Sequence, residues 1–164
     1  MEFIEYKNKK YPKFQSEGYA SQYIFPFAKK ICFGKGYDIG CSKKEWALPN
    51  SIPIDIKFGN GCDAYNLPDD CDVDYIFSSH CLEHLPDWPK ALDYWISKLK
   101  LNGVLFLYLP DYSQEYWRPW NCDKHFHSFT SNIIEDFLKD RKMQNILVSG
   151  VDLNNSFCVV SQKK

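Results

Sequence analysis

Two apolar segments separated by an amphipathic one constrain the fold of this chain more than any other feature. Residues 73–79, VDYIFSS, are rich in β-branched and aromatic side chains, which favour extended backbone. Residues 103–110, GVLFLYLP, are apolar on both faces, as in a strand that lies beneath helices. Between them apolar residues recur every three or four positions, which predicts a helix with one buried face. Strands that alternate with helices predict an α/β fold with a mostly parallel sheet.

Capping signals place the helices. Asp87 can cap the helix between the two segments, and Asn102 and Gly103 are expected to end it. Thr130 can cap a second helix that follows a long aromatic loop. A short helix is also expected within residues 17–36, although it contains a proline.

The remaining strands complete the sheet. They are expected at residues 37–40, 51–56, 145–150 and 156–162, with one brief strand in the turn-rich link at residues 61–70. Pro53 suggests an edge position for the second of these strands, because proline cannot donate to the ladder. The last two strands are expected to pair as an antiparallel edge hairpin.

Composition indicates a single globular domain that spans residues 1–164. The apolar share is 45 % and the charged share 25 %, and residues 1–15 are expected to be a flexible N-terminal segment. A net charge of −1 gives no basic field for nucleic acid or for an anionic membrane. The chain contains no apolar signal core, and its seven cysteines form no CxxC pair. We therefore expect a cytoplasmic protein with free thiols, no nucleic-acid partner and no membrane insertion.

Residues that can bind a ligand follow the ends of the predicted strands. Gly40 ends the first strand, Asp55 ends the second, and Ser79 and His80 follow the third. In open α/β sheets ligands bind outside the carboxyl ends of the strands. A carboxylate at the end of the second strand can accept hydrogen bonds from both hydroxyls of a ribose, and a glycine lets the backbone approach the ligand.

These segments resemble the class I S-adenosylmethionine-dependent methyltransferases, and more narrowly the small "LEHL" methyltransferase domains. The resemblance lies in YDIGCS, IPIDI, CDAYNLP, the unbroken block from VDYIFSSHCLEHLPD to GVLFLYLPD, and DKHFHSFT. It implies a Rossmann-like fold, methyl transfer, and S-adenosyl-L-methionine as cofactor. The cofactor-binding residues that it implies are Asp38, Gly40, Cys41, Ser42, Asp55, Ile56, Asp63, Ala64, Ser79 and His80.

The chain departs from the family pattern in the first crossover. Ser42 stands where the family usually has a second glycine, and only about a dozen residues join the first two strands, near the lower limit for a parallel crossover. A full first helix does not fit in this length. We expect backbone amides near Cys41 and Ser42, together with Lys43 or Lys44, to hold the methionine carboxylate instead.

The acceptor side is expected at the histidines. An alcohol must lose its proton as it attacks, and an imidazole with an ordinary pKa near 6.5 suits that task. We expect His125 to be the base, with His127 and Asp111 in support and His80 as the competitor. The long aromatic loop before these histidines suits a sugar or a flat ring, which predicts a small-molecule or carbohydrate acceptor, methylated at a hydroxyl.

Two alternatives remain open at this point. One is a non-catalytic binding or regulatory module, in which the fold has lost its cofactor together with the missing helix. A metal-dependent hydrolase that uses His80, His84 and His125 is the other. No metal is expected, because His80 and His84 do not follow the HExxH order and nothing nearby in the sequence supplies an obvious third ligand. Oligomeric state is not predicted.

Overall fold

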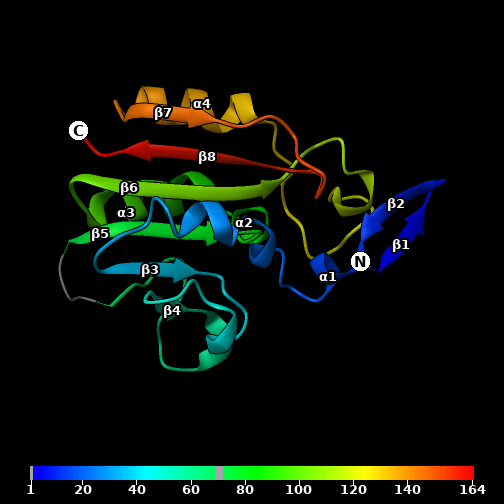
Figure 1. Ribbon diagram of the computed structural model, residues 1–164, viewed down its shortest axis with the longest axis horizontal. Helices are drawn as coiled ribbons and strands as arrows, with labels where there is room; N and C mark the ends of the chain where they lie inside the picture. The colour runs from blue at the N-terminus through cyan, green and yellow to red at the C-terminus, as the bar shows by residue number, and fades with distance from the viewer. Residues whose placement is uncertain (1, 69–71) are drawn as a thin grey trace.

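The computed structural model describes residues 2–68 and 72–164. Within these residues six strands form one sheet in the order β4-β3-β5-β6-β8-β7 (Figure 1). The strands are β3 (Gly36–Ile39), β4 (Ile52–Ile54), β5 (Val73–Ser79), β6 (Leu99–Pro110), β7 (Gln144–Val148) and β8 (Ser156–Gln162). The pairs β4–β3, β3–β5 and β5–β6 are parallel, and β8 is antiparallel to both β6 and β7. The α/β class, the mostly parallel sheet and the antiparallel edge hairpin are confirmed.

Helices cover both faces of this sheet (Figure 1). They are α2 (Ser21–Ala28), α3 (Trp88–Lys98) and α4 (Ser131–Asp140). The side chains of β5 and β6 alternate between two apolar clusters, as successive residues of a strand must. Ile76 and Leu105 face α3 and α4, whereas Phe77 and Phe106 face α2. The apolar character of both faces of β6 is therefore explained by helices on each side.

The end of α3 differs from the prediction. The helix ends at Lys98 and β6 begins at Leu99, so that Asn102 and Gly103 lie inside a strand. Leu99 is fully buried and pairs with Val73, which draws the chain into the sheet one turn earlier than the sequence signal. Asn102 has φ 61° there, in an irregular stretch of the strand where the register with β5 shifts.

The predicted N-caps are found at their positions. The Asp87 carboxylate accepts a hydrogen bond from the Lys90 amide at 3.2 Å, as an N-cap residue should. Thr130 is the N-cap residue of α4, but its hydroxyl makes no capping hydrogen bond.

The N-terminal segment forms a hairpin where a flexible segment was expected. It comprises β1 (Phe3–Tyr6) and β2 (Lys9–Pro12), followed by the short helix α1 (Lys13–Ser16). Lys7 and Asn8 both have positive φ, 50° and 62°, as a two-residue hairpin turn requires. The hairpin lies beyond the carboxyl ends of the parallel strands (Figure 1), which brings the start of the chain to the edge where ligands bind.

The first crossover is shortened, as predicted. Residues 40–51 contain only the 3₁₀ turn η1 (Lys44–Trp46) between the parallel strands β3 and β4. The buried Asp38 carboxylate accepts a hydrogen bond from the Leu48 amide at 2.6 Å, and Trp46 stacks on Tyr19 with ring centroids 4.6 Å apart. A buried carboxylate and apolar anchors thus hold this loop where a helix would otherwise pack.

The link after β4 is also compact. It contains the 3₁₀ turn η2 (Ile56–Phe58) and, in place of the brief strand that was expected, an isolated bridge between Asp63 and Asn66. Residues 69 and 70 of this link lie outside the described residues. Among the residues that are described, no helix has the length and apolar character needed to cross a membrane.

Candidate active site at the carboxyl ends of the parallel strands

Gly40 forms the turn at the end of β3. Its φ is 85°, and its amide donates to the Ile54 carbonyl at 2.8 Å. A Cβ atom at this position would lie 2.5 Å from the Cys81 side chain, which follows β5. Only glycine satisfies both the left-handed backbone and this close approach. The turn therefore brings the ends of β3, β4 and β5 together.

Asp55 and Ser42 are linked directly. The Asp55 carboxylate accepts from the Ser42 amide at 2.7 Å and from the Lys57 amide at 3.0 Å. Ser42 has φ 65°, so it adopts the backbone geometry of the glycine that it replaces. Each carboxylate oxygen has a second lone pair, which leaves Asp55 able to accept hydrogen bonds from a ligand hydroxyl as well.

The candidates for an anion at the methionine end change in the structure. The Ser42 amide already donates to Asp55, while Lys43 and Lys44 lie over the rings of Trp46 and Phe58, 4.0 and 5.5 Å from the ring centroids. Sequence reasoning missed Lys57, whose ammonium donates to the Ser42 hydroxyl at 2.7 Å. The sequence signal for Lys57 was a cation two residues after Asp55, the acid that ends the strand.

The adenine side offers an exposed apolar surface. Ile56 follows Asp55 and is 75 % exposed, so it can pack against a flat ring. The Asp63 carboxylate accepts from the Tyr65 amide at 2.7 Å, and the Ala64 carbonyl accepts from the Trp95 indole at 2.7 Å. These bonds fix the loop beside α3.

Two further residues complete the expected cofactor side. The Ser79 hydroxyl is buried at the end of β5 and has no hydrogen-bond partner within the described residues. Such an orphaned polar group fits a polar ligand at this edge. Asp38 is turned toward the crossover loop, and burial raises its pKa to about 7. The Ser79 hydroxyl, the Asp55 carboxylate and the exposed Ile56 together fit a nucleoside with a charged tail.

On the acceptor side, a loop docks onto the 3₁₀ turn η3 (Leu82–His84). The Glu83 carbonyl accepts from the amides of Phe126 and His127 at 2.8 and 3.2 Å. His84 Nδ1 hydrogen-bonds to the Lys124 carbonyl at 2.8 Å. This docking brings the His125 ring edge-on to His84, with centroids 4.5 Å apart.

His125 is buried in this arrangement. Its ring stacks on Trp117 with centroids 5.5 Å apart, and burial, aided by His84, lowers its pKa to about 4. The premise of an ordinary pKa near 6.5 is therefore wrong for this residue. Its expected helpers bond elsewhere, since His127 Nε2 contacts the Pro86 carbonyl at 3.1 Å and Asp111 accepts from the Ser113 amide at 2.9 Å.

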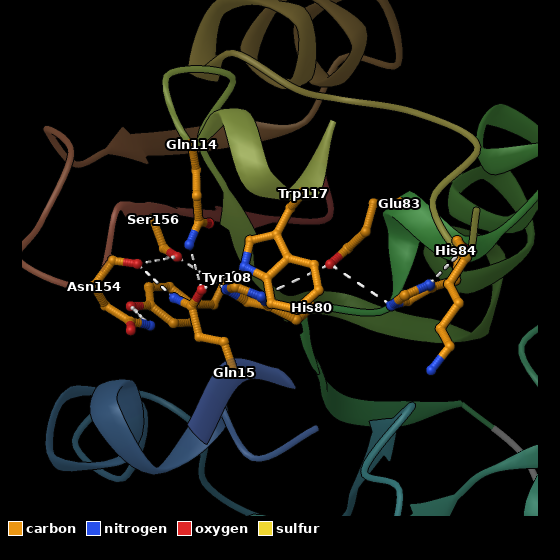
Figure 2. A network of polar contacts seen from close by, with 10 residues as sticks. Gln15, His80, Glu83, His84, Tyr108, Gln114, Trp117, Asn154 and Ser156 are labelled. Carbon is orange, nitrogen blue, oxygen red and sulfur yellow. Dashed lines mark hydrogen bonds and ion pairs between the residues drawn. The ribbon is translucent and has the colours of Figure 1, made fainter. Parts of the chain in front are cut away.

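His80 and Glu83 lie beside His125. His80 has φ 48°, and its Nε2 lies 2.9 Å from the Ser156 hydroxyl. Burial, followed by the neighbouring His125 and His84, lowers the pKa of His80 to about 3. Glu83 is fully buried, and burial raises its pKa. Figure 2 shows its carboxylate between two rings, 3.8 Å from His80 Nδ1 and 4.0 Å from His84 Nε2.

A second polar network, which the sequence did not reveal, adjoins His80 (Figure 2). The Tyr108 hydroxyl donates to the Asp152 carboxylate at 2.7 Å and accepts from the Asn154 amide at 2.9 Å. Gln15 donates to the Asn154 carbonyl at 2.5 Å and accepts from the Trp117 indole at 2.9 Å. The only sequence signal was a polar group at Tyr108 within an otherwise apolar strand.

Comparison with known proteins gives this site a context. Residues 17–147 match the family model described as a methyltransferase domain. No curated protein matches the sequence.

Solved structures share the fold. A protein of Thermotoga maritima, described as an S-adenosylmethionine-dependent methyltransferase and possible histamine N-methyltransferase, is 18 % identical with a TM-score of 0.70, over 92 % of this chain and 93 % of that one. A methyltransferase of Archaeoglobus fulgidus is 17 % identical with a TM-score of 0.64, over 92 % and 98 %. The N-methyltransferase NodS of Bradyrhizobium japonicum, in complex with S-adenosyl-L-homocysteine, is 14 % identical with a TM-score of 0.61, over 92 % and 88 %. At these identities the likeness shows a common fold.

Proposed function

This chain belongs to the methyltransferase domain family, and we propose on that premise that it transfers the methyl group of S-adenosylmethionine to a hydroxyl of a small-molecule or carbohydrate acceptor. One observation carries the proposal. The turn at Gly40, the Asp55 carboxylate and the Ser79 hydroxyl, which has no hydrogen-bond partner among the described residues, lie together at the carboxyl ends of neighbouring parallel strands. Ligands of open α/β sheets bind at this edge.

Each part of the edge has an assigned role in this proposal. Asp55 would hold the ribose, and the turn at Gly40 and Cys41, with Lys57 nearby, would hold the methionine end. Asp63, Ala64 and the exposed Ile56 would border the adenine, and Ser79 with His80 would form the floor beneath the methyl group. Asp38 would act indirectly, because its carboxylate holds the crossover loop through the Leu48 amide.

The acceptor would enter beside the histidines. The cofactor supplies a methyl group on a sulfonium, which is already an activated donor, so the protein mainly has to align the acceptor oxygen. We propose His125 as the group that takes the acceptor proton, with His80 as the competitor and His127 and Asp111 in support. A pKa of about 4 leaves the His125 imidazole neutral throughout the physiological range, so a ring lone pair is free to accept the proton, although the ring is a weaker base than an imidazole of ordinary pKa.

Calorimetric titration with S-adenosylhomocysteine tests the cofactor site. Replacing Asp55 by Ala should weaken binding more than about tenfold, because the ribose hydroxyls lose a charged acceptor. Asp55→Asn separates binding from folding, since its amide oxygen can still accept from the Ser42 or Lys57 amide. Asp136→Ala, at a side chain 75 % exposed on α4, is the matched control and should bind like the parent. Equal affinity in Asp55→Ala and parent would remove Asp55 from the site.

A thermal unfolding scan separates this function from a non-catalytic module of the same fold. A ligand at about a hundred times its dissociation constant stabilises the folded state by roughly 2.7 kcal/mol. We expect both S-adenosylmethionine and S-adenosylhomocysteine to raise the unfolding temperature. No shift with either compound at millimolar concentration would favour the binding module.

A further inference from the structure

The carboxyl group of Glu83, on the acceptor side, has unusual surroundings. This group is fully buried, and neither of its oxygens has a hydrogen-bond partner within the described residues. The nearest ring nitrogens, His80 Nδ1 and His84 Nε2, are 3.8 and 4.0 Å away, which is too far for a hydrogen bond in either protonation state. A buried polar group without a partner calls for an explanation, of which a missing ion is one.

The hydrogen bonds around the cluster orient lone pairs toward Glu83. His84 Nδ1 faces the Lys124 carbonyl, so this nitrogen carries a proton and, in the neutral ring, Nε2 carries the lone pair. The Ser156 hydroxyl donates to the Asn154 carbonyl, so it accepts from His80 Nε2 and leaves a lone pair on His80 Nδ1. In the neutral rings, both nitrogens that face Glu83 therefore carry lone pairs.

His125 completes the set. Ligand atoms of Glu83, His84 and His125 all lie within 4.8 Å of one another. Lone pairs of these groups thus converge on one place. Two atoms bound to the same Zn²⁺ at about 2.0–2.1 Å lie roughly 3–4 Å apart, so only a small movement of the ring of His84, whose side chain is 40 % exposed, is needed to close the site.

We propose that Glu83, His84 and His125 bind one divalent transition-metal ion. Imidazole nitrogens and one carboxylate suit Zn²⁺ and Fe²⁺, whereas Mg²⁺ and Ca²⁺ prefer oxygen ligands. The Lys124 carbonyl already holds His84 as a backbone carbonyl commonly holds a metal-ligating histidine. The third ligand that the sequence spacing around His80 and His84 failed to supply is His125, brought in by the fold.

The ion would stand at the end of β5, on the acceptor side. A metal ion lowers the pKa of an oxygen that it binds, so an acceptor hydroxyl on this ion would lose its proton more readily and His125 would act as a ligand rather than as the base. This consequence rests on the proposed function, whereas the binding of the ion does not. The two are therefore tested by different measurements.

Metal binding is measured on the full-length protein, reduced and stripped with a chelator, in the absence of S-adenosylhomocysteine. Titration with Zn²⁺ is expected to show one ion per chain and a higher unfolding temperature. Titration with Co²⁺ should give visible bands without a thiolate-to-cobalt charge-transfer band, because the ligands are nitrogen and oxygen. A strong thiolate band would place the ion on cysteines and overturn the proposal, as would the absence of stoichiometric binding.

Two variants locate the ion. Glu83→Gln and His84→Ala should each weaken Zn²⁺ binding by at least about a hundredfold, since loss of an outer partner alone costs roughly 10–100-fold. Glu83→Gln removes a buried carboxyl and should leave the metal-free protein at least as stable as the parent, so its loss of Zn²⁺ would not reflect misfolding.

The His84 side chain is partly exposed, so His84→Ala is a second variant that disturbs the core less. His127→Ala, at the ring that contacts the Pro86 carbonyl, is the matched histidine control and should keep one ion per chain. Parental affinity in both Glu83→Gln and His84→Ala would refute the assignment, whatever S-adenosylhomocysteine does.

Discussion

The two halves of the ligand-facing edge consist of different kinds of groups. At the ends of β3 and β4 the edge consists of backbone turns, the Asp55 carboxylate and an exposed Ile56. Beyond β5 and β6 it consists of buried side chains that come from segments far apart in the chain, such as Gln15, Glu83 and His125. The first half is a short loop, held by the carboxylates of Asp38 and Asp55 and by the stacking of Trp46 on Tyr19. The second half has kept, within a small domain, a dense set of polar groups whose arrangement depends on the whole fold.

This difference suggests where specificity lies. A nucleoside cofactor brings the same hydroxyls and ring to every enzyme of this kind, so a few backbone turns are enough to hold it. An acceptor must be distinguished from similar molecules, which requires buried polar groups that are left unpaired by the wrong ligand. We therefore expect substitutions in the second half to change turnover with little change in cofactor affinity.

The largest effect is expected at His125. Replacing it by Gln should lower turnover at neutral pH by roughly 10²–10⁴-fold, while the affinity for S-adenosylhomocysteine stays nearly unchanged. An acceptor is needed first, and screening sugars and small hydroxylated compounds for release of S-adenosylhomocysteine would identify one. Parental turnover in His125→Gln would mean that alignment alone is sufficient or that His80 is the base. A comparable loss of cofactor affinity would break the division between the two halves.

A smaller effect is expected from the pH dependence of stability at Asp38. Its folded-state pKa of about 7 lies above the ordinary 3.8, because burial disfavours the carboxylate. The folded state therefore binds the proton more tightly, and the stability from this group is complete below the ordinary pKa and is lost as pH rises through about 7.

Urea unfolding measures this dependence. In the parent, Asp38 contributes a decline of at most about 1.4 kcal/mol per pH unit between roughly pH 4 and 7. Asp38→Asn keeps an uncharged acceptor for the Leu48 amide. Its free energy of unfolding should therefore increase relative to that of the parent as pH rises. The thiols of Cys32 and Cys41 near Asp38 do not contribute there, since burial raises their pKa values to about 12. Parallel curves for variant and parent would show that Asp38 does not titrate in this range.

Sequence periodicity predicted the part of the fold in which local signals agree. The segments β5, α3 and β6 and the closing hairpin follow from residues close together in the chain. The end of α3 was wrong because burial of Leu99 in the sheet outweighed the turn signal at Asn102 and Gly103. The shortened crossover was predictable because the number of residues between two parallel strands is a limit that no side chain can change.

The acceptor side was predictable only as a set of candidate residue types. His84 and His125 come together because the amides of Phe126 and His127 bond to the Glu83 carbonyl, a backbone contact that residue types do not reveal. Gln15 was missed for the same reason, since its partner Asn154 is 139 residues away in the chain.

The smallest effect is expected from restoring a glycine in the reduced crossover. Ser42 at φ 65° carries a strain of about 1–2 kcal/mol, part of which is offset because glycine makes the unfolded chain more flexible. Ser42→Gly should therefore raise the unfolding free energy by less than about 1 kcal/mol and change cofactor affinity by less than about tenfold. Lys142→Gly, at φ 57° after α4, is the control with a similar backbone gain away from the site. A large loss of cofactor affinity in Ser42→Gly alone would show that the hydrogen bond between the Ser42 hydroxyl and the Lys57 ammonium matters more for binding than the backbone conformation does.

The bond from Gln15 to Asn154 has a consequence for how the protein is made on the ribosome. Synthesis runs from the N-terminus, so Gln15 emerges early and waits until almost the entire chain has followed before its partner exists. The turn at Gly40 needs the chain as far as Cys81, against which it packs, whereas the bond from Gln15 needs the chain as far as Asn154. The acceptor side is therefore the last part of the ligand-facing edge that a growing chain can complete.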